Sequence, residues 1–468
     1  MDNTDQAITE KMKTEGMSDA LVQDFLAKVE KVKQGSTGLV NWNEIGDLIH
    51  EEDEVILGNL QKTYTPQKGS LSKLAVIKLN GGMGTSMGLS KAKSLIRVKK
   101  GLSFLHIIAK QIEYMRNKYS IEIPLILMDS FNTQKDCQNE LNQMHFSQSL
   151  PTTFLQNKVP RLLKDTLLPV TLEDKNAEWC PPGHGDIYLS LKERGLLQNL
   201  LDKGYEYAFL SNGDNLGATI EPHILEYMID KKIDFAMEMT AKTLADKKGG
   251  VMYRKIVNKQ LTGINLLETA QVPPEYMDEF TGDTRFPSFS INNLWISLKT
   301  LSALMAEKPL DLSLIVNPKV IEGKEVIQLE TAMGSAISNF KNVKCVIIPR
   351  DRFAPVKKCE DLLVRMSDSY VLNEDYSLTM NPIRKKAGLG ECVVNLDDAY
   401  YKKVGDFESL FKEYPSMVFC ESLTIVGQVE FDVYVNLIGK VSIQNQTGQL
   451  QKISSLNKLQ IENEEIAF

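Results

Sequence analysis

A glycine-rich loop directly after a buried strand is the feature that most constrains the fold of this chain. The apolar run Leu74-Ala-Val-Ile-Lys-Leu79 leads into Asn80-Gly81-Gly82-Met83-Gly84-Thr85-Ser86-Met87-Gly88, which has four glycines in eight positions. Glycine removes the side chain where a backbone must approach a ligand closely. At the carboxyl end of a parallel strand, such a loop can direct backbone N–H groups at phosphate oxygens. The sequence therefore predicts a nucleotide-phosphate site in an α/β sheet, with Lys93 supplying charge; a simple tight turn is the alternative.

Two familiar phosphate-binding motifs do not fit this loop. The P-loop needs G-x-x-x-x-G-K-[ST], and here Lys93-Ser94 is preceded by Ala92 where that motif requires glycine. The dinucleotide motif G-x-G-x-x-G is not present either. The loop therefore belongs to another type of nucleotide site.

The order of apolar segments predicts alternating strands and helices, and so a doubly wound, mainly parallel sheet. Two short amphipathic helices are expected within residues 5–33, and residues 251–298 look like shorter antiparallel or mixed strands. From about residue 390 the apolar residues alternate with a period of two, which favours a short β-solenoid or a small sheet domain. Other predicted helices are 104–119, 187–201 and 222–229; other predicted strands are 123–128, 207–210, 234–240 and 343–348.

Composition narrows the class of protein. The 468 residues include 54 Lys plus Arg and 61 Asp plus Glu, a formal charge of −7, so nonspecific binding to nucleic acid is disfavoured. The six cysteines form no C-x-x-C pair and are expected to be buried thiols. The chain lacks a secretory signal pattern and a long apolar run, so we expect a soluble, cytoplasmic protein without a membrane partner.

Two further segments place polar groups where ligands bind in such sheets. Trp179-Cys-Pro-Pro-Gly-His-Gly-Asp186 precedes a predicted helix that Asp186 could cap, and its glycines leave room for a base or a sugar beside His184. A lone histidine is more often structural, so both interpretations stay open. Ser211-Asn-Gly-Asp-Asn-Leu216 follows a strand, and a carboxylate at Asp214 suits Mg²⁺ that bridges phosphates, although the same letters also form turns.

Three weaker segments add donors, acceptors and charge. Asn292 and Glu330 lie in otherwise apolar runs, where sugar hydroxyls could find mixed hydrogen-bonding partners. Residues 349–358 carry Arg350, Arg352, Lys357 and Lys358, which could form a phosphate-facing edge or an ordinary solvated loop.

These segments together resemble the UTP–glucose-1-phosphate uridylyltransferase family, also called UDP-glucose pyrophosphorylases. The similar motifs are the glycine-rich loop, P-P-G-H-G-D, N-x-D-N-L-G-A, the segments around 292 and 330, and Lys357 followed by Asp361-Leu-Leu, in family order from about residue 74 to 370. One departure is Leu89-Ser-Lys-Ala-Lys93, where family members typically show Gly-Pro before the lysine. Lys93-Ser94 aligns better with the family lysine than Lys91 does.

The resemblance implies a fold, a reaction and roles for individual residues. The fold would be a Rossmann-like, GT-A-like mixed sheet at residues 61–385, between a helical region at 1–60 and a C-terminal β-helix domain at 386–468. UTP and glucose 1-phosphate would give UDP-glucose and pyrophosphate, helped by Mg²⁺ on Asp214 and by Lys93 and Lys357. The implied nucleotide-binding residues are Leu79, Asn80, Gly81, Gly82, Lys93, Gln156 (reading uracil), Gly183 and Lys357; the implied sugar-phosphate residues are His184, Asn212, Asp214, Gly250, Asn292 and Glu330.

Two alternatives remain at this point. A related UTP-dependent enzyme could act on another sugar phosphate, such as that of N-acetylglucosamine. A regulatory protein could instead bind a nucleotide sugar without turnover, although both lysines and Asp214 argue against it. The oligomeric state cannot be read from the sequence.

Overall fold

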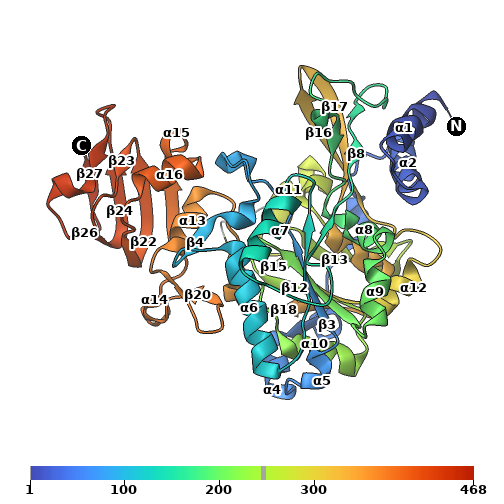
Figure 1. Ribbon diagram of the computed structural model, residues 1–468, viewed down its shortest axis with the longest axis horizontal. Helices are drawn as coiled ribbons and strands as arrows, with labels where there is room; N and C mark the ends of the chain where they lie inside the picture. Colours follow the sequence, from blue (N-terminus) through green and yellow to red (C-terminus); the bar gives the residue numbers. More distant parts are fainter. Residues whose placement is uncertain (1, 244–248) are drawn as a thin grey trace.

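A mixed sheet of eight strands forms the centre of the molecule (Figure 1). The computed structural model describes residues 2–243 and 249–468. All neighbouring strands of this sheet run parallel except β15, which is antiparallel to both of its neighbours. The mixed, mainly parallel sheet predicted from the sequence is therefore confirmed. Its strands, in spatial order, are β2 (Glu54–Ile56), β18 (Val343–Ile347), β12 (Phe235–Ala241), β15 (Ser288–Ser297), β11 (Tyr207–Asn212), β3 (Leu74–Leu79), β6 (Leu125–Asp129) and β7 (Thr153–Leu155).

Helices cover both faces of this sheet, which explains why its central strands are continuously apolar. Successive residues of β3 point to opposite faces: Val76 packs in one hydrophobic cluster and Ile77 in another. The first cluster includes buried residues of α6 (Phe104–Tyr119) and α10 (Pro222–Lys231), and the second includes residues of α8 (Ile187–Glu193), α9 (Leu196–Asp202) and α12 (Leu298–Leu304). Shorter helices of the α/β body are α3 (His50–Asp53), α4 (Leu57–Thr63), α5 (Lys68–Leu71), α7 (Gln134–Gln143) and α11 (Met277–Thr281).

The single helix predicted over residues 187–201 is wrong, because the structure has two helices there. Gly195 lies between α8 and α9 with φ +67°, a left-handed conformation that ends one helix and begins the next. Asp186 occupies the N-cap position of α8, as predicted, but its side chain makes no capping hydrogen bond. Its carboxylate instead accepts hydrogen bonds from Asn157 N, at 2.8 Å, and from Ser190 Oγ, at 2.6 Å.

The predicted amphipathic helices near the start of the chain are confirmed as α1 (Asn3–Thr14) and α2 (Asp19–Lys33). They pack side by side against a strand region of the body (Figure 1). Within the same predicted helical region, β1 (Ile45–Gly46) pairs with β13 and β2 joins the central sheet. Smaller sheets consist of β1, β13 (Val251–Val257) and β14 (Gln260–Leu267); of β9 (Leu162–Leu163), β16 (Leu314–Ile321) and β17 (Lys324–Thr331); and of β8 (Val159–Pro160) and β10 (Trp179–Cys180).

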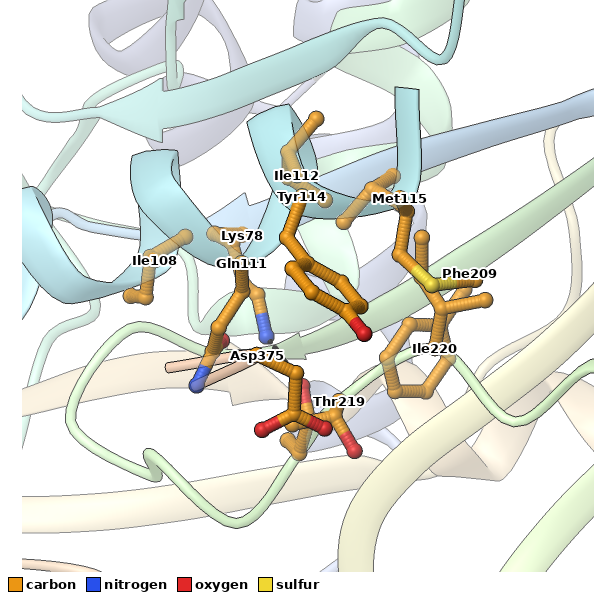
Figure 2. Close-up of a pocket in the computed structure, with 12 residues that line it drawn as sticks. Lys78, Ile108, Gln111, Ile112, Tyr114, Met115, Phe209, Thr219, Ile220 and Asp375 are labelled. Carbon is orange, nitrogen blue, oxygen red and sulfur yellow. Dashed lines mark hydrogen bonds between the residues drawn. The ribbon is translucent and has the colours of Figure 1, made fainter. Parts of the chain in front are cut away.

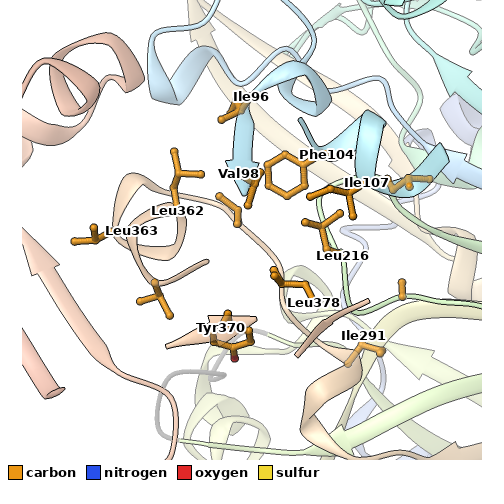
Figure 3. Packing of buried hydrophobic residues seen from close by; sticks show 14 of the residues in the cluster. Ile96, Val98, Phe104, Ile107, Leu216, Ile291, Leu362, Leu363, Tyr370 and Leu378 are labelled. Atoms are coloured by element: carbon orange, nitrogen blue, oxygen red, sulfur yellow. The ribbon is translucent and has the colours of Figure 1, made fainter. Parts of the chain in front are cut away.

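Parallel strands dominate the last part of the chain, at the left of Figure 1. The predicted period of two is confirmed: Leu423, Ile425 and Leu437 are buried. A hydrophobic cluster runs from the body into this region through α13 (Cys359–Met366), and Figure 3 shows its Leu362 toward Val98 and its Leu363 farther from Val98. The elements are β21 (Val393–Leu396), β22 (Ser416–Val426), β24 (Asn436–Gln444), β26 (Gln460–Glu462) and β27 (Glu465–Ala467) in one sheet, β23 (Val429–Glu430) and β25 (Gln451–Lys452), the hairpin β19 (Tyr370–Leu372) and β20 (Leu378–Met380), and α14 (Pro382–Lys386), α15 (Asp398–Tyr401) and α16 (Val404–Leu410).

All six cysteines are free and buried, as expected. Among the described residues, no helix combines the length and apolar character needed to cross a bilayer.

Candidate active site

The glycine-rich loop after β3 folds back so that its end lies beside its beginning. Gly84 and Gly88 adopt left-handed conformations, with φ +64° and +73°. Lys93 N donates a hydrogen bond to Gly82 O at 3.0 Å, which closes the loop. A Cβ added at Gly82 would meet no atom within 4 Å, so the backbone there has open space beside it. The loop therefore brings Lys93 next to an accessible stretch of backbone.

Lys93 and Asp214 come together at the carboxyl ends of two adjacent strands. β3 and β11 are parallel neighbours, with Leu79 opposite Asn212. Gly213 N donates to Leu79 O at 2.9 Å, so the two following loops start in contact. Lys93 Nζ lies 2.7 Å from Asp214 Oδ2, and the two side chains are only 16% and 25% exposed. Of the two candidate lysines, the structure thus places Lys93 against Asp214.

The segment that carries Lys357 runs directly beside Asp214. Val356 N donates to Asp214 O at 3.2 Å, and Asn215 forms a β-bridge with Pro355. Burial raises the pKa of Glu268, and the positive charge of Lys357 partly opposes this shift. A Cβ on Gly250 would lie 3.0 Å from Glu268 Oε2, which places Gly250 in the same neighbourhood.

Arg352 does not belong to a phosphate-facing edge, and the expectation for this residue is wrong. Its guanidinium is buried and binds both oxygens of the buried Glu238, at 2.8 and 2.7 Å. Trp295 Nε1 also donates to Glu238, at 2.9 Å. A buried arginine is stable when a carboxylate pairs with it, and this carboxylate comes from a neighbouring strand that the sequence did not associate with it.

Lys78 is a buried cation that the sequence did not single out, and it lies behind the same loops. Its Nζ donates to Ser211 Oγ and to Ala218 O, both at 2.7 Å. Burial and then the charge of Arg352 lower the pKa of Lys78 to about 7. Figure 2 shows Lys78 beside a small cavity of about 60 Å³ that Thr219 and α6 also line. Lys78 therefore ties β3 to the loop that carries Asp214.

Gln156 connects the glycine-rich loop with the segment that contains His184. Its Nε2 donates to Gly183 O at 2.8 Å, and a Cβ on Gly81 would lie 3.2 Å from its Oε1. Gly183 has φ +81°, and a Cβ there would lie 2.4 Å from Thr331 O. Only glycine fits at this crossing of two backbones.

His184 and Glu330 lie on neighbouring segments. His184 Nδ1 accepts a hydrogen bond from Met333 N at 2.9 Å, and burial lowers the pKa of His184 to about 4. The ring is therefore neutral at pH 7, with its hydrogen on Nε2 as a donor. Glu330 Oε1 accepts from Asn317 Nδ2 at 3.1 Å, across the β16–β17 pair.

Asn292 occupies an unusual backbone position. It has φ +57°, within an irregularity where the register of β12 against β15 shifts. The paired register of β11 against β15 ends with Leu210 opposite Leu294, so Asn292 lies just outside this pairing. Left-handed residues other than glycine are held by surrounding structure and often occur at functional sites.

The arrangement offers limited protein ligands for a metal. Within the described residues, no group of three or more His, Cys, Asp or Glu side chains is arranged to hold an ion. Asp214 supplies one carboxylate. Mg²⁺ commonly takes only one or two protein carboxylates and the phosphates of its substrate, so this donor set fits an ion that arrives with nucleotide.

Predicted site residues at the ends of β3, β11 and β7 are thus in contact: Lys93 with Asp214, and Gln156 with Gly81 and Gly183. Sequence reasoning missed Lys78 and Glu238, which lie behind the site loops. The only signal in the sequence was a charged residue within an otherwise apolar strand, and such a residue does not reveal which group it contacts. The ligand-binding roles predicted for the site residues stay predictions.

Several known proteins are similar to this chain in sequence and in fold. The family model described as UTP–glucose-1-phosphate uridylyltransferase matches residues 22–438. Proteins with that name from Hordeum vulgare and Saccharomyces cerevisiae are 37% and 40% identical, over 94% and 88% of this chain and 94% and 81% of theirs. The crystal structure of a mutant of UDP-glucose pyrophosphorylase from Leishmania major in complex with UDP-glucose is 36% identical, with a TM-score of 0.89, and each chain is covered completely. A UDP-glucose phosphorylase from Trypanosoma brucei is 37% identical with a TM-score of 0.88 and the same coverage. The chain therefore belongs to the UTP–glucose-1-phosphate uridylyltransferase family.

Proposed function

We propose that this chain transfers the uridylyl group of UTP to glucose 1-phosphate, forming UDP-glucose and pyrophosphate. The family membership and the names of the relatives support the reaction. The observation that carries the proposal is the Lys93–Asp214 ion pair beside the open backbone at Gly82, with the Lys357 segment hydrogen-bonded to Asp214. Two cations and a row of backbone N–H groups at one sheet edge suit a triphosphate.

The uracil end would lie beside Gly81 and Gln156. Gln156 has its Nε2 committed to Gly183 O, which leaves Oε1 as an acceptor. Uracil presents an N–H donor at N3, and an acceptor that is already oriented matches it. Cytosine has no hydrogen at that nitrogen, so the buried acceptor would be left unpaired, which is a strong basis for discrimination.

The sugar phosphate would lie along His184, Asn212, Asn292 and Glu330, near Gly250. The neutral His184 can donate from Nε2, and Glu330 can accept from sugar hydroxyls. A side chain at Gly250 would crowd Glu268, because a Cβ there would lie 3.0 Å from Glu268 Oε2. The mixture of donors and acceptors fits a hydroxyl-rich ring.

Transfer needs no side-chain nucleophile, because a phosphate oxygen of the sugar phosphate attacks the α-phosphorus of UTP and pyrophosphate leaves. Lys93 and Lys357 would bring two anions together and stabilise charge as it develops. Asp214 would orient Lys93 in the free protein and hold Mg²⁺ in the complex. Bound Mg²⁺ would neutralise phosphate charge.

The C-terminal β-helix, the domain boundaries and the cellular location are also proposals. The parallel pairing of β21, β22, β24 and β26, and of β23 with β25, supports a short β-helix in the C-terminal region. The domain division near residue 385 follows the same reasoning, whereas the division near residue 60 rests on α1 and α2 alone, because β1 and β2 pair with strands of the body. Six buried free thiols support a reducing, cytoplasmic location.

One experiment tests the activity, the substrate and the metal together. The protein is incubated with UTP and a panel of sugar 1-phosphates, with Mg²⁺ or with a chelator, and pyrophosphate and nucleotide sugar are measured. Pyrophosphate with glucose 1-phosphate and Mg²⁺ is the expected result. Faster turnover of N-acetylglucosamine 1-phosphate would assign a different sugar, and binding of UDP-glucose without any pyrophosphate would indicate a regulatory protein.

A further inference from the structure

The carboxyl group of Asp129 lies beneath the glycine-rich loop, and none of the described residues forms an ion pair with it. Asp129 is the last residue of β6, and its side chain is fully buried. Oδ1 accepts hydrogen bonds from Asn80 Nδ2 at 2.6 Å and from Thr133 Oγ1 at 3.4 Å. Oδ2 has no hydrogen-bond partner in the part of the chain that the structure describes. An ionised carboxylate in this place would leave a buried charge uncompensated.

Asp129 touches two of the segments proposed to bind the nucleotide. Its side chain holds Asn80, at the start of the glycine-rich loop, and its backbone oxygen accepts from Gln156 N at 2.8 Å. Asn80 Nδ2 also donates to Cys137 Sγ at 3.0 Å, and Ser94 Oγ lies 3.7 Å from the same sulfur. Asn80 and Ser94 are the two ends of the loop. Asp129 and Cys137 therefore fix both ends of the loop relative to Gln156.

The groups around this carboxyl are neutral. α7 contributes Cys137, and burial raises its pKa to about 12, so the thiol keeps its proton. The strand end of β3 contributes the amide of Asn80, and the turn before α7 contributes the hydroxyl of Thr133. Burial raises the pKa of Asp129 to about 7, although these hydrogen bonds oppose the shift.

We propose that Asp129 is a positioning residue that aligns Asn80 and Gln156 for the nucleotide, and that it does so in its protonated form. An ionised Asp129 would place a negative charge under the loop that is to receive phosphates. Binding of a nucleotide therefore takes up a proton on Asp129 when the pH exceeds the pKa of this carboxyl. The inference rests on the proposed function, because it assumes a nucleotide phosphate on the loop.

UDP-glucose is the suitable probe, because its diphosphate diester has no group that titrates near neutral pH. For the unmodified chain, we expect the dissociation constant to rise as the pH increases above about 7, approaching a tenfold increase per pH unit when binding takes up one proton. Asp129→Asn has a neutral amide of nearly the same shape and should bind UDP-glucose with little pH dependence. Asp136→Asn is the matched control: it removes a carboxylate on α7 and should keep the pH profile of the unmodified chain.

Measurements of kinetics and stability distinguish a role of Asp129 in aligning the nucleotide site from a merely structural role. Asp129→Ala should raise KM for UTP about tenfold, since Asn80 loses a buried acceptor, while circular dichroism shows an intact fold. Without ligand, the melting temperature of the unmodified chain should fall relative to Asp129→Asn as the pH rises from about 4 to 7, because the unfolded chain ionises this group first.

The outcomes that overturn the inference differ from those that overturn the proposed function. Equal pH dependence of binding in Asp129→Asn and the unmodified chain would refute a protonated Asp129 at the site. So would a melting difference that does not change with pH. Failure of the unmodified chain to bind UDP-glucose at any pH would instead refute the proposed function, while the melting comparison would still report the protonation of Asp129.

Discussion

The contact between Lys93 and Asp214 joins residues that lie 121 positions apart in the chain. Each belongs to a loop that leaves the carboxyl end of a strand, and the two strands are neighbours. In the free protein each charge partly neutralises the other. A phosphate or a metal must therefore compete with this pair, and that competition links the two residues in function.

Replacing Lys93 by alanine should reduce kcat at least a hundredfold, because a charge that stabilises the transition state is removed. Lys91→Ala is the matched control, since Lys91 is exposed and two residues away; it should retain most activity. Steady-state assays with circular dichroism check both variants. Near-normal turnover in a folded Lys93→Ala protein would remove this lysine from the chemistry.

Asp214→Asn should nearly abolish the Mg²⁺-dependent activity, because an amide is a much weaker Mg²⁺ ligand than a carboxylate. It also leaves Lys93 without its carboxylate partner. The measurement is activity as a function of Mg²⁺ concentration. An unchanged magnesium dependence would place the metal elsewhere.

At the scale of elements, the N-terminal helices stabilise the segment that leads to His184. Lys11 of α1 forms an ion pair with Glu178 and donates to Val170 O at 3.2 Å. Burial opposes ionisation of Glu178, but hydrogen bonds from Lys11 and Lys175 outweigh it and lower its pKa to about 2. Trp179, the next residue, lies under the ammonium groups of Lys11 and Lys158, at 5.5 and 4.6 Å from the ring centre.

Lys11→Met should therefore raise KM for glucose 1-phosphate several-fold and change kcat less, since breaking a largely buried ion pair costs about 3 kcal/mol and loosens the Trp179–His184 segment. Lys13→Met is the control, because Lys13 pairs with the exposed Asp19 on the surface. Kinetics with varied glucose 1-phosphate compare the two variants. Identical KM values would mean that α1 does not position this segment.

Across the whole molecule, a continuous hydrophobic cluster connects the α/β body to the C-terminal strands. It includes Val76 of the central sheet, Leu362 and Leu363 of α13, and Leu423 of β22 (Figure 3 shows the part around α13). Lys403, which precedes α16, also lies against the glycine-rich loop: a Cβ at Gly88 would be 2.8 Å from Lys403 Cγ. The C-terminal region is thus joined to the body by packing and reaches the site loop.

Leu362→Ala should lower the stability of both parts together, by about 3 kcal/mol, because the side chain is fully buried where α13 links them. Hydrogen exchange followed in β3 and in β24 measures each part. Loss of protection in β24 alone would show that the two regions unfold independently. An exposed leucine of the C-terminal region, Leu459, provides the control, since Leu459→Ala should be nearly neutral.

The sequence alone determined the sheet class, most elements and the position of the glycine-rich loop, because hydrophobic periodicity and glycine content act locally. It was wrong where a single residue ends a helix, as Gly195 does, and where a charged side chain turns inward, as Arg352 does. It could not identify Asp129 or Lys78 as part of the site, because a charged residue in an apolar strand does not reveal its contacts. Which lysine faces Asp214, and which strands bring the site loops together, depended on strand order and register. Those are long-range pairings, and only the packed chain decides them.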